Sequence, residues 1–380
     1  MELKKIHLPF RIKKPILAFG SQTKNSVCFA KDSFAYISAT HQNLDDPQDF
    51  SGFERAVKHF LEKKPKIIAY DLHPEYQSTK YAAELRPSTF ELRAIQHHHA
   101  HIASCMLDNG FKNQKVIGVA FDGTGLGSDS HIWGAEFFIC DYERFKRRAY
   151  LKEIPLLGGE KAILEPARLL AAWLYLIYKD RFLDLDISVV KKIGKAKWRI
   201  LKKMLVSRFN SPLASSTGRL FDAAASLILG KPEARYEAEL AMELESLASS
   251  WTKDEGRRTK DARHYRFTLI KDKDCYMINP LPMFKEIIRD LETKEPKERI
   301  TYRFHFTIAS MIRNICLILR EEDKIRKIVL SGGVFQNRLL SGLSLDLLNK
   351  EGFEVFTHNK LSCNDSGISL GQAAIASFRS

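Results

Sequence analysis

Four of the twelve histidines in this chain lie within positions 97–101, in the stretch QHHHAH. If this stretch is helical, His97 and His101 lie one turn apart on the same face of the helix. Two imidazoles in that arrangement can bind one metal ion, and imidazole suits zinc and iron among others. The side chains of His98 and His99 would point away from the face that carries this pair. The simpler alternative is a histidine-rich helix with one buried histidine and the others solvated.

Two aspartates have similar surroundings and could complete a metal site. Asp122 follows an apolar strand and Asp365 opens the last helix, each in a short polar turn beside glycine. Taken singly, Asp365 could be only a helix N-cap and Asp122 only a turn residue. Together with His97 and His101 they form a mixed nitrogen and oxygen shell with open positions. Such a shell suits a metal that polarises a carbonyl group or orients a phosphate.

Glycine-rich turns offer a second kind of contact, to an anion or a nucleotide. The turn of Gly123, Thr124 and Gly125 presents backbone N–H groups and a hydroxyl. The turn of Gly332 and Gly333 lies between a strand and a helix, where the helix dipole favours an anion. Neither turn matches a phosphate-loop or dinucleotide fingerprint. The alternative is that both are needed only for tight chain reversal.

The elements that would hold these residues fall into two similar halves, in which short strands are joined by turns and lead into helices. The first half contains the histidine helix, which we expect to end near Asn109 and Gly110. The other elements expected there are strands 15–20, 26–30, 34–38 and 66–71 and helices 53–63 and 76–85. The second half begins with strand 116–121, which runs into the acidic turn, and strand 132–140. This repetition indicates a duplicated α/β unit with a cleft between its halves.

Residues from about 160 to 325 are predicted to be mainly helical. The elements expected there are helices 166–178, 218–229, 234–249 and 302–319 and a strand pair at 266–270 and 274–278. Strands at 327–331 and 353–356 and a last helix running to about 378 follow. No low-complexity linker separates the halves, so we expect two interleaved lobes. The first comprises residues 1–145 with the C-terminal helix 366–380, and the second comprises residues 146–365 with a helical insertion.

The composition is that of a globular protein. The 380 residues suffice for one large or two medium domains, and 44% of them are hydrophobic. The chain has no run of about 18 apolar residues and no apolar leader, so we expect a cytoplasmic protein without a membrane partner. Six scattered cysteines without a CxxC pair argue against a zinc ribbon and against a disulfide framework.

The formal net charge of +14 favours an anionic partner, which could be a nucleic acid, a nucleotide or an acidic protein. Basic residues are densest in 189–205, where they alternate with apolar residues. We interpret this segment as an amphipathic helix with a solvated lysine face. RNA binding is the alternative.

Several blocks of the sequence, in this order, resemble the C-terminal transferase domain of the HypF family of hydrogenase-maturation carbamoyltransferases. The blocks are AYDLHPEYQSTKYA (69–82), QHHHAHIAS (96–104), GVAFDGTGLGSDSHIWGAEF (118–137), SSTGRLFDAAASLILG (215–230), YEAELAMELESLA (236–248), LSGGVFQNRLL (330–340) and NDSGISLGQAAIA (364–376). The TsaD-like threonylcarbamoyl transferases of tRNA share the HxxxH pair and the terminal aspartate. The blocks QHHHAH, FDGTG and GGVFQNR fit the hydrogenase branch better.

The resemblance implies a duplicated RNase-H-like architecture of the actin and sugar-kinase class (ASKHA), with a nucleotide in the cleft between the lobes. HypF-type enzymes pass a carbamoyl group from carbamoyl-adenylate to the C-terminal cysteine thiolate of the acceptor protein HypE. By this resemblance, a divalent metal, zinc or iron, would be held by His97, His101, Asp122 and Asp365. The adenine nucleotide (carbamoyl-adenylate, ATP or AMP) would be bound by Lys24, Gly123, Thr124, Gly125, Arg219, Gly332, Gly333 and Asn337.

Three turns depart from the family pattern, so the acceptor or donor could be altered. The family's NDGG reads Asn364-Asp365-Ser366-Gly367, its YEGQ reads Tyr236-Glu237-Ala238-Glu239, and Gln42-Asn43 replaces a Gly-Asp pair before leucine. Full-length HypF enzymes also carry an acylphosphatase-like domain, zinc fingers and a YrdC-like adenylation domain, none of which matches this sequence. We therefore expect a separate YrdC and acylphosphatase module to supply the adenylate. The alternatives are a TsaD-like tRNA transferase and a non-catalytic nucleotide-binding partner protein.

Overall fold

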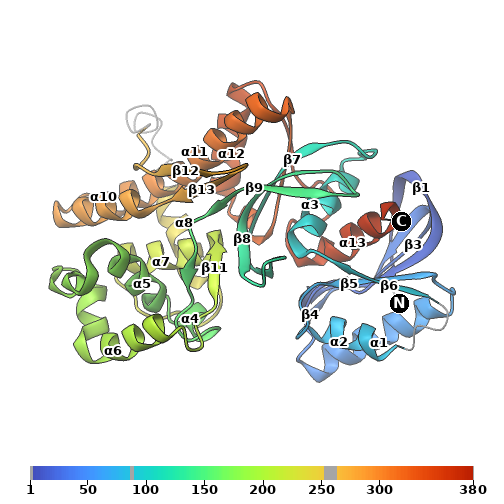
Figure 1. Ribbon diagram of the computed structural model, residues 1–380, viewed down its shortest axis with the longest axis horizontal. Coiled ribbons are helices and arrows are strands. Elements are labelled where there is room, and N and C mark those ends of the chain that lie inside the picture. The colour runs from blue at the N-terminus through green and yellow to red at the C-terminus, as the bar shows by residue number, and fades with distance from the viewer. Residues whose placement is uncertain (1–2, 86–89, 252–262, 380) are drawn as a thin grey trace.

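The computed structural model of the chain describes residues 3–85, 90–251 and 263–379. The architecture is α/β, with two lobes that are each built on one sheet (Figure 1). It is the duplicated RNase-H-like, actin-type arrangement that the sequence predicted, with a largely helical insertion in the second lobe.

The first sheet has the strand order β3-β1-β5-β6. Strand β1 (Lys4–Ala18) is antiparallel to β3 (Cys28–Ile37), whereas β5 (Ile67–Asp71) and β6 (Glu91–Ile95) run parallel to it. Helices α1 (Pro47–Leu61) and α2 (Gln77–Glu84) also belong to this lobe, and a small separate sheet pairs β2 (Thr23–Asn25) with β4 (His41–Asn43).

Strand β3 differs from the sequence prediction, which had two strands separated by a turn at 31–33. The structure has one continuous strand, in which Asp32 adopts a φ of 52° opposite Ile12 at an irregularity in the pairing. Aspartate tolerates this left-handed conformation, so the chain makes a local bulge and stays in the sheet. The basic leader, for which no strand was predicted, forms the first part of β1.

The second sheet repeats the pattern of the first. Strand β7 (Val116–Leu126) lies between antiparallel β8 (Ile132–Cys140) and parallel β14 (Lys327–Ser331), as β1 lies between β3 and β5. Strand β15 (Glu354–Phe356) lies outside β14, as β6 lies outside β5. The second sheet therefore begins at Val116, where the strand pattern of the sequence begins to repeat, and inside the residues 1–145 expected for the first lobe.

The rest of the second lobe extends this sheet and covers it with helices. On the far side of β8, β9 (Phe145–Leu151) pairs with β13 (Cys275–Asn279), and β13 pairs with β12 (Thr268–Asp272). A short pair of β10 (Ile154–Pro155) and β11 (Leu213–Ser216) joins the edge of β8. The helices are α4 (Lys161–Leu164), α5 (Ala167–Tyr178), α6 (Ser188–Ser207), α7 (Thr217–Leu229), α8 (Glu239–Trp251), α10 (Leu281–Glu292), α11 (Lys297–Asp323) and α12 (Arg338–Lys350). No helix in the described ranges is both long and apolar enough to cross a membrane.

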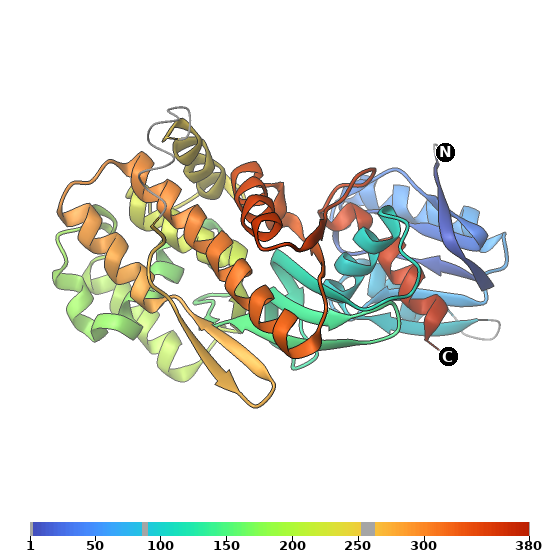
Figure 2. The same cartoon turned by 90° about the horizontal axis from the view of Figure 1, so that it is seen from above.

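Two buried helices join the lobes. Helix α3 (His97–Asp108) is buried along its whole length and contacts β7, β8 and β14 of the second sheet. Helix α13 (Ile368–Phe378) packs on α3 and contacts β1, β3 and β5 of the first sheet (Figures 1 and 2). At Gly371 the helices are so close that a Cβ atom would overlap the carbonyl of Ala100. The histidine helix is therefore held rigidly at the centre of the molecule.

Candidate functional site between the two lobes

The first turn of α3 presents the histidines predicted to pair. Gln96 caps the helix by accepting the N–H of His99 at 2.8 Å, so the helix begins directly with His97. The rings of His97 and His101 lie on the same face with centroids 5.0 Å apart. His99 instead donates to the backbone carbonyl of Asp141 at 2.6 Å, and burial lowers its pKa to about 4. His98 receives a hydrogen bond from Gln96 and lies outside the pair.

Asp122 and Asp365 come together with this pair. Asp122 Oδ2 lies 3.3 Å from His97 Nε2 and 3.1 Å from His101 Nε2, and Asp365 Oδ1 lies 3.5 Å from His101 Nε2. One ligand atom from each of the four residues lies within 4.8 Å of the others. Two imidazole nitrogens and two carboxylate oxygens suit zinc or ferrous iron. The residues present thus fit the ion that the sequence predicted.

Asp71 adds an outer contact that the sequence analysis did not assign to the site. Its Oδ2 accepts the Nδ1–H of His97 at 2.8 Å, and its Oδ1 accepts the N–H of His73 at 3.0 Å. Both Asp71 and His97 are fully buried. A carboxylate behind an imidazole fixes the tautomer so that the other nitrogen, here Nε2, faces the cluster. The one signal in the sequence was a carboxylate at the end of a buried strand.

Charge governs the protonation of the cluster. Burial alone would lower the pKa of His97, but Asp71 and Asp122 outweigh it and raise that pKa well above its usual value. Burial alone would raise the pKa of Asp122, but hydrogen bonds from His101 and His97 hold it well below its usual value. The carboxylates thus favour the protonated form of both histidines when no ion is bound. A divalent cation would displace those protons on binding.

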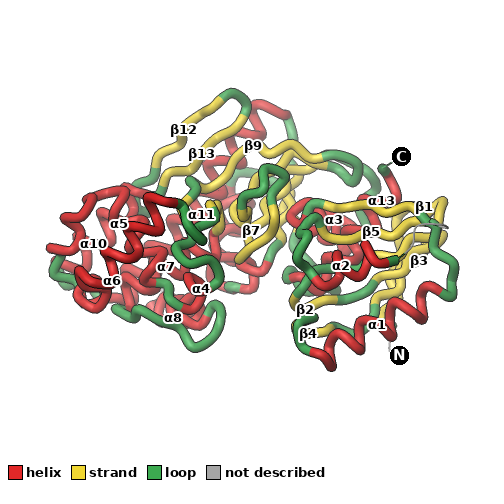
Figure 3. Tube along the Cα trace, turned by 60° about the horizontal axis from the view of Figure 1, so that its bottom comes forward, coloured by secondary structure: helices red, strands yellow, loops and turns green. Residues whose placement is uncertain are grey.

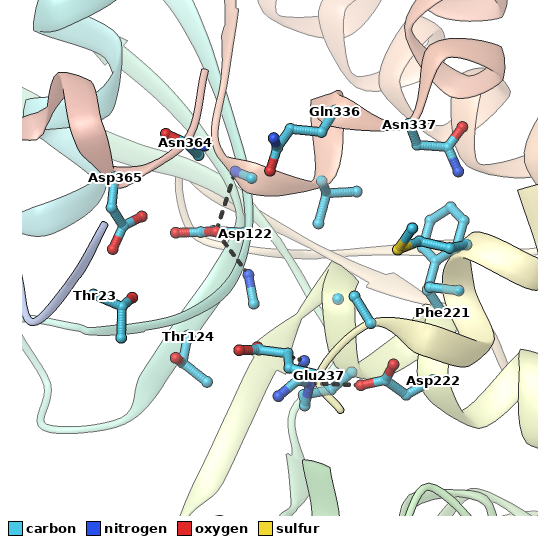
Figure 4. A pocket seen from close by; sticks show the side chains of 18 of the residues that line it. Thr23, Asp122, Thr124, Phe221, Asp222, Glu237, Gln336, Asn337, Asn364 and Asp365 are labelled. Atoms are coloured by element: carbon cyan, nitrogen blue, oxygen red, sulfur yellow. Dashed lines mark hydrogen bonds and ion pairs between the residues drawn. The ribbon is translucent and has the colours of Figure 1, made fainter. Parts of the chain in front are cut away.

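A pocket of about 640 Å³ adjoins the cluster and is lined by both lobes (Figure 4). Asp122 and Asp365 form part of its wall, and Thr23 and Lys24 reach it from β2 of the first lobe. Six of the eight residues predicted to bind nucleotide line this pocket: Lys24, Gly123, Thr124, Arg219, Gly333 and Asn337.

The other two predicted residues, Gly125 and Gly332, lie behind the pocket wall. A Cβ on Gly125 would come within 2.6 Å of His98 and 2.8 Å of His97, so this glycine lets β7 pass beneath the histidine rings. Gly332 has a φ of +105° and packs against the backbone of Phe121. At both positions a side chain would overlap neighbouring atoms, so glycine is needed there for close packing.

The backbone amides of the glycine turns also have a different role from the one predicted. The N–H groups of Gly123 and Gly333 both donate to Asp122 Oδ1, at 2.9 and 3.1 Å (Figure 4). They therefore hold a carboxylate of this chain and are not free for a phosphate. Asn337 is similarly engaged, since its side chain caps α12 through the N–H of Leu340.

Among the described residues that line the pocket, the cations are Lys24 and Arg219. Arg219 is buried at the start of α7, where its Nε lies 2.8 Å from Asp222 and its Nη2 donates to Glu237 at 3.2 Å. Its Nη1 is buried without a hydrogen-bond partner among the described residues. Burial raises the pKa of Asp222 to about 6, although Arg219 opposes the shift.

A buried polar network, also missed in the sequence, fixes the segment that carries Asp365. Asp108 at the end of α3 accepts the backbone N–H groups of Asn359, Lys360 and Leu361 at 2.7 to 3.1 Å. His358 lies 3.4 Å from Asp108 and hydrogen-bonds Ser331 at 3.0 Å. The network links α3, the end of β14 and the approach to η3 (Asp365–Gly367). It therefore sets the position of Asp365 relative to the histidines.

The turns that depart from the family pattern line the pocket or support the strand beside it. Ala238 lines the pocket with a φ of +66°, a conformation that glycine adopts without strain. Ser366 donates to Asn364 Oδ1 at 2.8 Å inside the turn before α13. Asn43 pairs with Thr23 and so supports the strand that carries Lys24.

Comparison with known proteins gives consistent matches along the chain. Residues 118–372 match the family described as "Carbamoyltransferase, Kae1-like Domain, second subdomain", and residues 11–108 match the "HypF Kae1-like domain". Carbamoyltransferase HypF2 of Cupriavidus necator is 33% identical over 95% of this chain and 46% of its own length. A carbamoyltransferase HypF homolog of the same organism is 30% identical over 95% of this chain and 91% of its own length.

Solved structures agree with these matches. A crystal structure of full-length HypF in the phosphate- and nucleotide-bound form superposes with a TM-score of 0.90 at 36% identity, covering 98% of this chain and 47% of the other. HypF of T. kodakarensis superposes with a TM-score of 0.85 at 29% identity, covering 98% of this chain and 49% of the other. The chain thus spans about half the length of these HypF proteins and nearly all of the shorter homolog.

Proposed function

Because this chain belongs to the HypF carbamoyltransferase family, we propose that it moves a carbamoyl group from carbamoyl-adenylate to a cysteine of an acceptor protein. In this proposal the acceptor is a HypE-type protein of NiFe hydrogenase maturation. The observation that carries the proposal is the wall shared by the cluster and the pocket. Asp122 and Asp365 belong to both, so a donor held in the pocket lies beside the four candidate ligands.

In this proposal His97, His101, Asp122 and Asp365 hold one divalent ion. When bound, the ion supplies Lewis acidity toward the carbamoyl carbonyl or the phosphate of the donor. Asp71 keeps His97 in the tautomer that directs Nε2 to the ion, because its carboxylate accepts the Nδ1–H.

The donor is held by charge and shape. A volume of about 640 Å³ lies within the usual range for small-molecule sites, and the pocket is lined by both lobes. Lys24 and the unpartnered Nη1 of Arg219 suit the phosphate of an adenylate, since a buried guanidinium gains most from a charged acceptor.

The transfer itself is an acyl substitution. The acceptor thiolate attacks the carbamoyl carbon, the carbon–sulfur bond forms, and the carbon–oxygen bond to phosphate breaks as AMP leaves. None of the chain's own cysteines lines the pocket. Cys363 lies two residues before Asp365, but burial raises the pKa of its thiol to about 11. A thiol with such a pKa is a poor nucleophile near neutral pH, so the sulfur comes from the acceptor.

The test measures carbamoyl transfer and metal content in parallel. The chain is mixed with a HypE-type acceptor, with a YrdC-like module and its acylphosphatase partner supplying the adenylate, and the acceptor is examined by mass spectrometry. Wild-type protein should carry about one ion per chain and give a carbamoyl adduct on the acceptor cysteine. The double variant His97→Ala with His101→Ala should lose both, and His59→Ala, at a half-buried position on α1 outside the site, should lose neither.

Two results would count against the proposal. Retention of full metal content by the double histidine variant would place the ion elsewhere. A metal-loaded wild-type chain that leaves the acceptor cysteine unmodified, and modifies tRNA instead, would identify a different acceptor class.

A further inference from the structure

Helix α6 carries an outward stripe of unpaired positive charge. Gly194, with a φ of 64°, interrupts the helix, and Lys195, Arg199 and Lys203 then recur every four residues. Residues four apart lie on one face, about 6 Å from each other along the axis. Arg208 follows at the end of the helix. In the described part of the chain none of these four side chains makes an ion pair, whereas carboxylates neutralise the neighbouring Lys191, Lys197 and Lys202.

Apolar side chains are exposed beside this stripe. Ile200, Val206 and Phe209 are 62, 70 and 73% exposed. Single exposed apolar residues are ordinary, but three within ten residues, next to four unpaired cations, indicate a contact surface. We name the seven residues the α6 surface: Lys195, Arg199, Ile200, Lys203, Val206, Arg208 and Phe209.

The chain connects the end of the α6 surface to the pocket over a few residues. The segment after Phe209 leads into β11, whose Ser216 donates to the carbonyls of Asp122 and Gly123 at the pocket. The carbonyl of Asn210 accepts the N–H of Gly158 at 2.9 Å, in the loop that precedes α4. In Figures 1 and 3, α4 lies at the edge of the second lobe that faces β4 of the first lobe.

We infer that the α6 surface docks an acidic, amphipathic segment of the acceptor protein and so guides the acceptor cysteine to the cleft. The inference rests on the proposed function, because it concerns the acceptor of that transfer. Four exposed cations without partners attract anionic groups, and an apolar partner surface would remove the three exposed apolar side chains from water. A protein segment with carboxylates and apolar residues supplies both. RNA would neutralise the cations through phosphates but would leave Ile200 and Val206 exposed to water.

Binding measurements without any donor test this inference. The charge variant carries Lys195→Glu, Arg199→Glu, Lys203→Glu and Arg208→Glu. Its matched control reverses four exposed lysines of the first lobe: Lys13, Lys31, Lys63 and Lys66. The probes are a HypE-type acceptor, a synthetic helical peptide with glutamate and leucine faces, tRNA and vesicles of anionic phospholipid.

The charge variant should bind the peptide and the acceptor about tenfold or more weakly at low salt, and the difference should shrink as salt rises. The control should bind as wild type does. Ile200→Ser with Phe209→Ser should weaken binding at every salt concentration, because burial of apolar surface is not screened. All variants should bind metal and nucleotide normally.

Equal weakening by the charge variant and its control would overturn the inference, because it would show attraction by net charge alone. Binding of tRNA or vesicles that depends on the α6 surface, without binding of the peptide, would also overturn it. If binding of the peptide depends on the α6 surface but binding of the HypE-type protein does not, the docking surface is supported and the proposed acceptor is rejected. Docking can thus be judged even if transfer fails.

Discussion

The substitution Asp71→Asn isolates the contribution of the carboxylate behind the histidine pair. In the wild type, Oδ2 of Asp71 accepts from His97 Nδ1 and Oδ1 accepts from the N–H of His73. Asparagine has nearly the same shape but only one oxygen. If that oxygen faces His97, the new amide nitrogen lies against the N–H of His73, donor to donor. If the amide is reversed, its NH₂ group faces His97 Nδ1 and drives the imidazole proton to Nε2, where it blocks an ion.

In either orientation of the amide, one buried, charge-assisted hydrogen bond is lost. Such a loss raises the free energy of the site by roughly 1–3 kcal/mol. Removal of such outer contacts from metal-binding histidines weakens metal affinity by about 10- to 100-fold, or roughly 1.4–2.7 kcal/mol. We expect Asp71→Asn to fall in this range. It should remain folded, because the side chain keeps its volume in a fully buried site.

Competition for Zn²⁺ with a chromophoric chelator near neutral pH measures the effect. The control is Asp141→Asn, because the side-chain oxygen that accepts the N–H groups of Glu143 and Arg144 is retained in asparagine. Its dissociation constant should equal that of the wild type. A folded Asp71→Asn protein that binds Zn²⁺ within about twofold of the wild type would refute the role assigned to Asp71.

Three further outcomes follow from the contacts described. Burial raises the pKa of the Asp222 carboxyl to about 6. Between about pH 4 and 6 the folded state therefore keeps a proton that the unfolded state has lost, so the free energy of unfolding should fall as the pH rises through this range. Asp222→Asn should flatten that part of the curve in urea unfolding at a series of pH values. Gly371→Ala should cost about 3 kcal/mol or more by overlap with α3, whereas Gly342→Ala, in open space on α12, should stabilise by up to about 1 kcal/mol in thermal unfolding. His358→Ala should speed hydrogen exchange in 357–365 and weaken metal binding about tenfold by freeing Asp365, whereas unchanged exchange there would remove its positioning role.

The candidate ligands that the sequence pointed to, and that the structure brings together, are those whose local context is informative. His97 and His101 are one helical turn apart, and helical periodicity alone brings their rings together. Asp122 and Asp365 were recognised because one follows a strand and the other begins a helix, beside glycines that let the backbone turn. The duplicated fold was recognisable for the same reason, since strand, turn and strand recur with similar lengths in both halves.

The remaining features depend on contacts between distant segments. Asp71 and His358 reach the site through tertiary packing, and no spacing in the sequence relates them to His97 or Asp365. The amides of Gly123 and Gly333 were predicted to face a phosphate, but only the folded chain reveals a carboxylate between them. The single strand over Cys28–Ile37 was missed because its polar residues are typical of a turn, whereas pairing with β1 keeps them in the sheet.

Asp122 makes the cluster and the pocket a single site. Its Oδ2 faces His97 and His101, and its Oδ1 accepts the amides of Gly123 and Gly333, which line the pocket. The two oxygens belong to one rigid carboxylate, so an ion that moves one of them also moves the contacts of the other. A ligand that orders the glycine turns then strengthens binding of the ion, and the ion strengthens binding of the ligand. The two free-energy changes are equal, because thermodynamic linkage is reciprocal. In the proposed reaction this coupling favours the state in which donor and ion are both bound, which is the state in which the acceptor sulfur is to arrive.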